Sequence, residues 1–363
     1  MKRTWQSVLI VICSFLTLSC TLSPEPALAL REASGAADLE QAINAGAFGN
    51  IHSVIANLSG EGAVEWYFSG ADQRAGIPVG IVEFDSATLH DVRSLTKSVV
   101  SLLFGIALSE GAITSVDDPI TKYLSDYSDL FTADIQRIRL RHLLSMNSGF
   151  GWDERTYPYG DARNSETALD AAADRIRYVL SLPVVALPGE RFVYSSGDVD
   201  LLAQIVSRAT GMPLDAYARE KLFTPLGIDQ FEWPEYESGG VIASWGLRLR
   251  PRDMVKIGRL VLQLGLWNGQ QVVSTSWIRE LMSPRVQLDA RRGVGYGNYW
   301  WFGRIGEGEG AIDFMQAVGN GGQRIALFRE QGLTIVTTAG FYGGDDSQSD
   351  EIVRSLYRVL VGE

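Results

Sequence analysis

Cysteine and histidine are both scarce in this sequence of 363 residues. The two cysteines, Cys13 and Cys20, lie near the N-terminus, so the rest of the chain has no thiol for a disulfide, a thiolate nucleophile or a metal. The three histidines, His52, His90 and His142, are scattered, which excludes a zinc site of ordinary composition. Only carboxylate sites for Ca²⁺ or Mg²⁺ stay open. We therefore expect no metal and no cofactor.

A histidine-dependent serine mechanism also has little support. The G-x-S-x-G nucleophile elbow is absent from the sequence. His142 stands at the start of an apolar helix, where packing or capping is the expected role, and His52 falls in a predicted strand. His90 lies four residues before Ser94 and is kept as an alternative partner for that serine.

Acidic residues outnumber basic ones in this sequence. Lys+Arg 32 against Asp+Glu 43 gives a net charge of −11, and no strongly basic stretch occurs, which argues against a nucleic-acid partner. Hydrophobic residues at 46% and charged residues at 21% are typical of a folded, soluble protein with a sizeable core.

The N-terminus has the pattern of an export signal. Lys2 and Arg3 precede an uncharged stretch, Val8 to Leu18, that is too short to span a bilayer. Residues 1–29 form a signal peptide if cleavage follows Ala29, or the signal of a lipoprotein if it ends before Cys20. We expect an exported protein, periplasmic or extracellular, with a lipid on Cys20 as the membrane attachment in the second case.

The chain begins and ends with strands. We expect a helix over Asp38–Ala45 and then a β-meander of Ile51–Leu58, Ala63–Phe68 and Gly80–Phe84. Ser94–Leu108 is apolar nearly all round, which predicts a helix buried between layers. Strands return at Arg324–Arg329 and Leu333–Ala339, before a final helix.

Helices with loops dominate the middle of the sequence, at Leu140–Met146, Ala168–Leu180 and Val199–Ala209. We therefore predict an α/β (α+β) fold in which an antiparallel sheet from both chain ends is flanked by helices. The α/β domain comprises residues 30–116 and 239–363, and the inserted, mainly helical domain comprises residues 117–238.

The strongest chemical motif is Ser94-Leu95-Thr96-Lys97, at the start of the buried helix. Spacing of i to i+3 places both side chains on one face, so the amine can reach the hydroxyl. The helix N-terminus and burial both disfavour a lysine cation and favour negative charge on the serine oxygen. Ser94 is then an activated nucleophile with Lys97 as its base. Alternatively, Ser94 caps the helix and Lys97 is a surface residue.

Two further motifs accompany it. Tyr194 stands at a loop-to-helix junction, where its hydroxyl can shuttle a proton, or else it is a core tyrosine with a satisfied hydroxyl. The segment Gly319-Asn320-Gly321-Gly322 precedes a predicted strand and offers backbone N–H groups for an oxyanion, although a tight turn explains it equally.

Taken in order, Ser94-x-x-Lys97, Tyr194-x-Ser196 and the glycines at 319–322 resemble the penicillin-recognising serine hydrolases. That family includes class C β-lactamases, D,D-peptidases, esterases and 6-aminohexanoate-dimer hydrolases. The resemblance implies a β-lactamase-like fold, acylation of Ser94, Lys97 as base and Tyr194 as proton shuttle. It also implies substrate or oxyanion contacts from Ser196 and the glycine segment, with an N–H near Gly322 joining that of Ser94.

Two positions depart from the family pattern. Ser196 stands where the family usually has asparagine, and Gly319 where β-lactamases and peptidases have lysine or histidine. Both departures favour the branch of 6-aminohexanoate-dimer hydrolases and esterases. In that branch an aromatic loop covers the substrate, a role for which Trp152, Tyr157 and Tyr159 are candidates, with core packing of Trp152 as the alternative.

We therefore expect a hydrolase that cleaves a small-molecule amide or ester through an acyl-enzyme. The alternatives are a β-lactamase or D,D-peptidase acting on cell-wall-like substrates, and a non-catalytic binding module with the same fold.

Overall fold

The computed structural model of the protein describes residues 35–362. The expected export signal, residues 1–29 with Cys20, lies outside them. Within the described part of the chain, no helix has both the length and the hydropathy needed to cross a bilayer.

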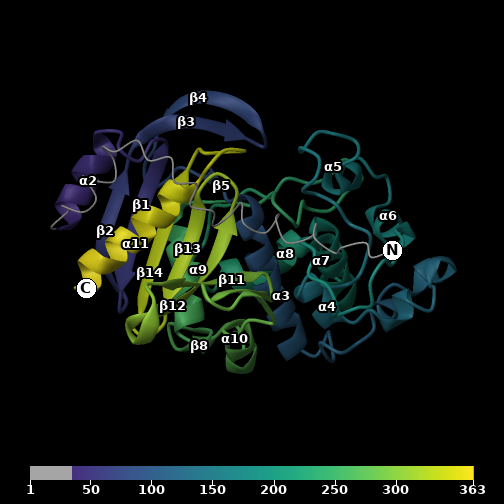
Figure 1. Cartoon of the computed structure of the whole chain (residues 1–363). Helices are drawn as coiled ribbons and strands as arrows, with labels where there is room; N and C mark the ends of the chain where they lie inside the picture. Colours follow the sequence, from purple (N-terminus) through teal and green to yellow (C-terminus); the bar gives the residue numbers. More distant parts are fainter. Residues whose placement is uncertain (1–34, 363) are drawn as a thin grey trace, which may run out of the picture.

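An antiparallel sheet of eight strands forms the centre of the larger part of the molecule (Figure 1). The strand order is β2-β1-β14-β13-β12-β11-β10-β9, so the first two strands lie beside the last one. The strands are β1 (Ile51–Leu58), β2 (Glu61–Tyr67), β9 (Val286–Asp289), β10 (Val294–Gly297), β11 (Trp300–Ile305), β12 (Ile312–Gly319), β13 (Gln323–Phe328) and β14 (Leu333–Ala339). The predicted sheet built from both chain ends is therefore confirmed.

Helices cover both faces of this sheet. On one face, α2 (Ala36–Asn44) and α11 (Ser347–Val361) bury Leu39, Ile352 and Leu356 against the sheet residues Ala326 and Ile335. On the other face lie α3 (Thr96–Ser109) and α9 (Pro251–Leu262). Because β13 and β14 are buried on both faces, their apolar residues, such as Ile325, Ala326 and Leu327, follow one another rather than alternating with exposed polar ones.

Close helix packing depends on small residues at two contacts. A side chain at Gly258 of α9 would collide with Thr334 and Ile325 on the sheet, and one at Gly105 of α3 would enter the ring of Trp277. Trp277 belongs to α10 (Thr275–Leu281) and donates its indole N–H to the Ser101 carbonyl at 2.9 Å. These contacts fix α3 within the core.

Helices and turns make up most of the chain between α3 and α9, and they lie to one side of the sheet (Figure 1). They are α4 (Leu140–Leu144), α5 (Ser165–Asp170), α6 (Arg175–Ser181), α7 (Ser196–Thr210) and α8 (Leu214–Ala218). The helix predicted over Ala168–Leu180 is in fact two helices, because a non-helical turn separates Asp170 from Arg175. Gly211 ends α7 in the left-handed conformation, as predicted.

Six further strands of residues 35–362, in three pairs, lie outside this sheet. β3 (Ser69–Arg74) pairs with β4 (Ile77–Glu83), β5 (His90–Asp91) with β6 (Arg248–Leu249), and β7 (Leu266–Trp267) with β8 (Gln270–Gln271). The prediction of one continuous meander was wrong here, since the third predicted strand belongs to the separate β3–β4 hairpin. Its partner β3 has a polar sequence, SGADQR, which gave no strand signal.

Candidate active site

Ser94 lies in a turn that the backbone holds in an unfavourable conformation. A single 3₁₀ turn, Arg93–Leu95, leads into α3, so the α-helix begins two residues later than predicted. Arg93 has φ of 52°, the left-handed region that residues with a Cβ rarely adopt. Its guanidinium lies 3.4 Å from Asp91 and 4.8 Å from the ring centroid of Tyr342. These contacts stabilise the turn that presents Ser94.

Lys97 is buried directly beside Ser94. Its Nζ donates to Ser94 Oγ at 3.3 Å and to the Ser244 carbonyl at 2.7 Å, and only 1% of the residue is exposed. None of the salt bridges found among residues 35–362 involves Lys97. The predicted pair is thus in place, and the surface alternative for Lys97 is excluded.

Tyr194 reaches the same point from the segment before α7. Lys97 Nζ lies 5.1 Å from the centroid of its half-buried ring, and the guanidinium of Arg155 lies 4.7 Å from it. The ring also stacks against Trp301 at a centroid distance of 6.1 Å. The structure therefore brings together the three residues predicted for catalysis, and places the guanidinium of Arg155 against the ring of Tyr194.

The glycine segment contributes one residue to the surroundings of Ser94. A Cβ on Gly319, the last residue of β12, would lie 2.1 Å from the Val92 carbonyl oxygen, so the two backbones touch. Gly321 and Gly322, with φ of 93° and 95°, face the side chains of Tyr342 and Ser349 instead. Of these glycines, it is Gly319 that packs on the nucleophile turn, and the oxyanion contact expected from an N–H near Gly322 stays a prediction.

The side chain of Asn320 bonds to a neighbouring loop, whereas that of Ser196 lies near enough to the Glu166 carboxyl to act on it. Asn320 Oδ1 accepts the Gly343 N–H at 3.0 Å. Ser196 is fully buried as the first residue of α7, and its N–H donates to Glu154 Oε2 at 2.8 Å. Direct contact of either side chain with a substrate stays a prediction.

The predicted aromatic loop divides into a buried and an exposed part. Trp152 is 6% exposed, donates its indole N–H to Glu154 and packs on Gly197, so core packing describes it and the prediction that it covers a substrate was wrong. Tyr159 is 56% exposed and lies within electrostatic range of Tyr194. Tyr157 is partly buried, and its carbonyl accepts from Asn164. The two tyrosines keep their predicted role as a proposal.

Several carboxyl groups are buried behind the three catalytic candidates. Burial, together with the nearby Glu154, raises the pKa of Glu166 to about 7, and Lys97 opposes that rise. Burial also raises the pKa of Asp198 to about 8, although Ser148 donates to it at 2.7 Å. Buried carboxyl groups therefore lie close to Lys97 and Tyr194, and Glu166 and Asp198 change charge near neutral pH.

The histidines have structural surroundings. His142 Nδ1 accepts the Arg139 N–H at 3.0 Å and so caps α4, which confirms its predicted role. His52 lies in β1, also as predicted, and stacks on Phe84, where burial lowers its pKa to about 4. His90 is fully buried and neither of its ring nitrogens has a hydrogen-bond partner, so it does not act on Ser94.

Several residues that surround this site were not predicted. Glu154, Arg155, Glu166, Ser244 and Trp301 belong to no motif, and only folding brings them to Lys97 and Tyr194. Among residues 35–362, no group of three or more potential ligands from His, Cys, Asp and Glu could hold a metal.

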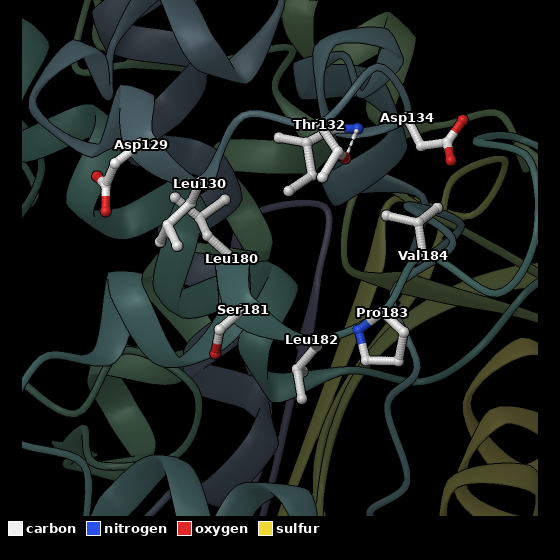
Figure 2. Close-up of a pocket in the computed structure, with 10 residues that line it drawn as sticks. Asp129, Leu130, Thr132, Asp134, Leu180, Ser181, Leu182, Pro183 and Val184 are labelled. Atoms are coloured by element: carbon white, nitrogen blue, oxygen red, sulfur yellow. Dashed lines mark hydrogen bonds between the residues drawn. The ribbon is translucent and has the colours of Figure 1, made fainter.

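A surface hollow in the helical part is separate from this site (Figure 2). Leu130, Thr132 and Leu180 line it, together with the segment 181–184 at the C-terminal end of α6, and it contains none of the residues around Ser94. We assign no function to it.

Comparisons with known proteins agree with this geometry. The Beta-lactamase family model matches residues 41–357. The chain is 31% identical over 151 residues to a proposed D-alanyl-D-alanine carboxypeptidase of Escherichia coli O157:H7, a match that covers 40% of this chain and 34% of that protein. It is 25% identical over 232 residues to the 6-aminohexanoate-dimer hydrolase of Paenarthrobacter ureafaciens, covering 58% and 57% of the two chains. It thus spans between a third and three fifths of the length of these relatives.

Solved structures show the same fold. EstCE1, a hydrolase with promiscuous acyltransferase activity, superimposes with a TM-score of 0.67 at 16% identity, over 92% of this chain and 98% of that one. A penicillin-binding protein homologue from Pyrococcus abyssi gives a TM-score of 0.61 at 19% identity, over 86% and 73%. The predicted β-lactamase-like fold is confirmed, and the chain belongs to the β-lactamase family.

Proposed function

We propose that this protein is a serine hydrolase that cleaves a small amide or ester through an acyl-enzyme on Ser94. The observation that carries the proposal is the buried Lys97 amine, 3.3 Å from Ser94 Oγ and 5.1 Å from the Tyr194 ring centroid. Membership of the β-lactamase family and the esterase and dimer-hydrolase relatives support it.

Acylation needs four roles. Lys97 accepts the Ser94 proton while Ser94 Oγ forms a bond to the carbonyl carbon of the substrate. The proton passes by way of Tyr194 to the leaving alcohol or amine, and the carbon–oxygen or carbon–nitrogen bond breaks. The Ser94 N–H, with a second backbone N–H on the Gly319 side, binds the oxyanion. In deacylation, water gives its proton to the Lys97–Tyr194 pair and its oxygen bonds to the acyl carbon. The bond from that carbon to Ser94 Oγ then breaks, and the proton passes to Ser94 Oγ as the acid product leaves.

The position of Gly319 favours esters and linear amides over β-lactams. A lysine or histidine at this position would offer a cation to a substrate carboxylate, and the contact with Val92 leaves no room for any side chain. The exposed ring of Tyr159 is the proposed cover over the substrate.

A serine-directed phosphonate tests the chemistry. We expect one adduct, mapped by mass spectrometry to Ser94, and none in Ser94→Ala. Turnover of p-nitrophenyl esters and linear amides, but not of nitrocefin, would support the esterase or amidase branch. Turnover of nitrocefin in preference to esters and linear amides would identify the protein as a β-lactamase. Ligand binding without an adduct or turnover would identify it as a binding module.

We also propose export from the cytoplasm, on the basis of the charged and apolar pattern in residues 1–29. The mass of the protein purified from its source distinguishes cleavage after Ala29 from a lipid-bearing Cys20.

A further inference from the structure

Ser244 connects the Lys97 amine to a buried carboxyl group. Its backbone carbonyl accepts from Lys97 Nζ at 2.7 Å, and its hydroxyl donates to Glu166 Oε1 at 3.3 Å. Ser244 is fully buried and Glu166 is 7% exposed. A single residue therefore contacts the amine with one polar group and the carboxyl with the other.

The position of Glu166 is set independently of Lys97. Glu166 lies in the first turn of α5, and the side chain of Asn164 accepts the N–H groups of Glu166 at 2.9 Å and Thr167 at 3.3 Å. Asn164 Nδ2 in turn donates to the Tyr157 carbonyl at 2.7 Å. The backbone that carries the Glu166 side chain is thus held by the cap of its own helix and by the loop before it.

The other buried carboxyl at this point has different partners. Glu154 Oε2 accepts the indole N–H of Trp152 and the N–H of Ser196, both at 2.8 Å, so it anchors the start of α7. The ionisable groups that act on Glu166 come from four parts of the chain: Lys97 on α3, Asp170 on α5, Glu154 and Tyr159 in the loop before α5, and Tyr236. Lys97 is the cation among them.

We propose that Glu166 is a positioning residue for Lys97. It holds Ser244 so that the Ser244 carbonyl receives the amine, and its negative charge stabilises the ammonium formed when Lys97 accepts the Ser94 proton. Glu166 itself forms no bond to the substrate and keeps its own protonation state through the step. This inference depends on the proposed acyl-enzyme chemistry.

Glu166→Gln tests the inference, because glutamine keeps the shape and an acceptor oxygen for Ser244 but removes the charge. For hydrolysis of p-nitrophenyl acetate, we expect kcat to fall about 10- to 100-fold with KM within twofold of wild type. Without the carboxylate the ammonium is less stable, so the acid limb of kcat/KM should move to lower pH by about one unit. Glu166→Asp should return that limb toward the wild-type position.

Asp170→Asn is the matched control. Asp170 is a carboxyl on the same helix, its pKa is also raised to about 7, chiefly by burial, and it too lies within electrostatic range of Lys97, but the Ser244 hydroxyl bonds to Glu166 and not to Asp170. We expect its kcat and its acid limb to stay within twofold and a few tenths of a pH unit of wild type. Ser244→Ala is the second variant, for use if Glu166→Gln does not fold. It keeps the carbonyl and loses the hydroxyl, and should lower kcat severalfold at constant KM.

An unchanged acid limb in Glu166→Gln, or an equal shift in Asp170→Asn, would overturn the inference. So would wild-type kcat in both Glu166→Gln and Ser244→Ala. Failure of the wild-type enzyme to form the Ser94 phosphonate adduct would instead refute the proposed function.

Discussion

Substitution of Gly319 by alanine should disable the site while leaving the fold intact. The added Cβ would lie 2.1 Å from the Val92 carbonyl oxygen, whereas ordinary contact begins near 3.4 Å. One of the two backbones must therefore move by about 1 Å, and Val92 is only two residues from Ser94. A displacement of that size at the nucleophile costs about 100-fold in kcat, and the overpacking costs about 1–3 kcal/mol in the free energy of unfolding.

The assay pairs ester turnover with thermal unfolding. Gly62→Ala in β2 is the control, because nothing lies within 4 Å of a Cβ there. We expect Gly62→Ala to keep wild-type kcat, and Gly319→Ala to lose it with a cooperative unfolding transition still present. A Gly319→Ala enzyme as active as wild type would show that the contact with Val92 does not control the position of Ser94.

Three predictions concern stability. Gly105→Ala should cost about 2 kcal/mol or more, because the new Cβ would lie 1.9 Å from Trp277 Cδ1, and an unchanged melting temperature would contradict this. Burial lowers the pKa of His52 from 6.5 to about 4, so as the pH falls the unfolded chain binds a proton at this residue before the folded protein does. The free energy of unfolding therefore decreases as pH falls below 6.5. Urea unfolding at pH 7 and pH 4.5 checks this. The free energy of unfolding of His52→Gln, relative to that of wild type, should rise between pH 7 and pH 4.5 by about 3 kcal/mol at most. The pKa of Asp198, raised by burial from 3.8 to about 8, has the opposite sign, since the folded state keeps the proton and stability is lost as pH rises from about 4 to 8. The free energy of unfolding of Asp198→Asn should therefore rise relative to that of wild type between pH 5 and pH 9. Equal pH dependence of the two proteins would refute a raised pKa at Asp198.

The sequence predicted the elements whose patterns are local. The apolar run of Ser94–Leu108 identified α3, and the Gly211 stop signal identified the end of α7. The spacing of Ser94 and Lys97 was enough to predict their contact, because one helical turn fixes it. The predicted bounds of strand β14, Leu333–Ala339, match the structure, because the turn before Leu333 marks where the strand begins.

Other features depend on contacts that no local pattern encodes. The polar strand β3 forms only because it pairs with β4, and the bond from Lys97 to Ser244 joins residues 147 positions apart. Trp152 was a candidate for the substrate loop because aromatic residues suit both a lid and a core. Only the tertiary contact with Gly197 distinguishes the two.

The partners of the nucleophile come from the whole length of the chain. Ser94 and Lys97 are made before Ser244 and Gly319. A nascent or truncated polypeptide without the two later residues would carry the reactive serine without the groups that orient it, so hydrolysis should begin only after Gly319 has been made and has folded against Val92. Activity would then report completion of folding.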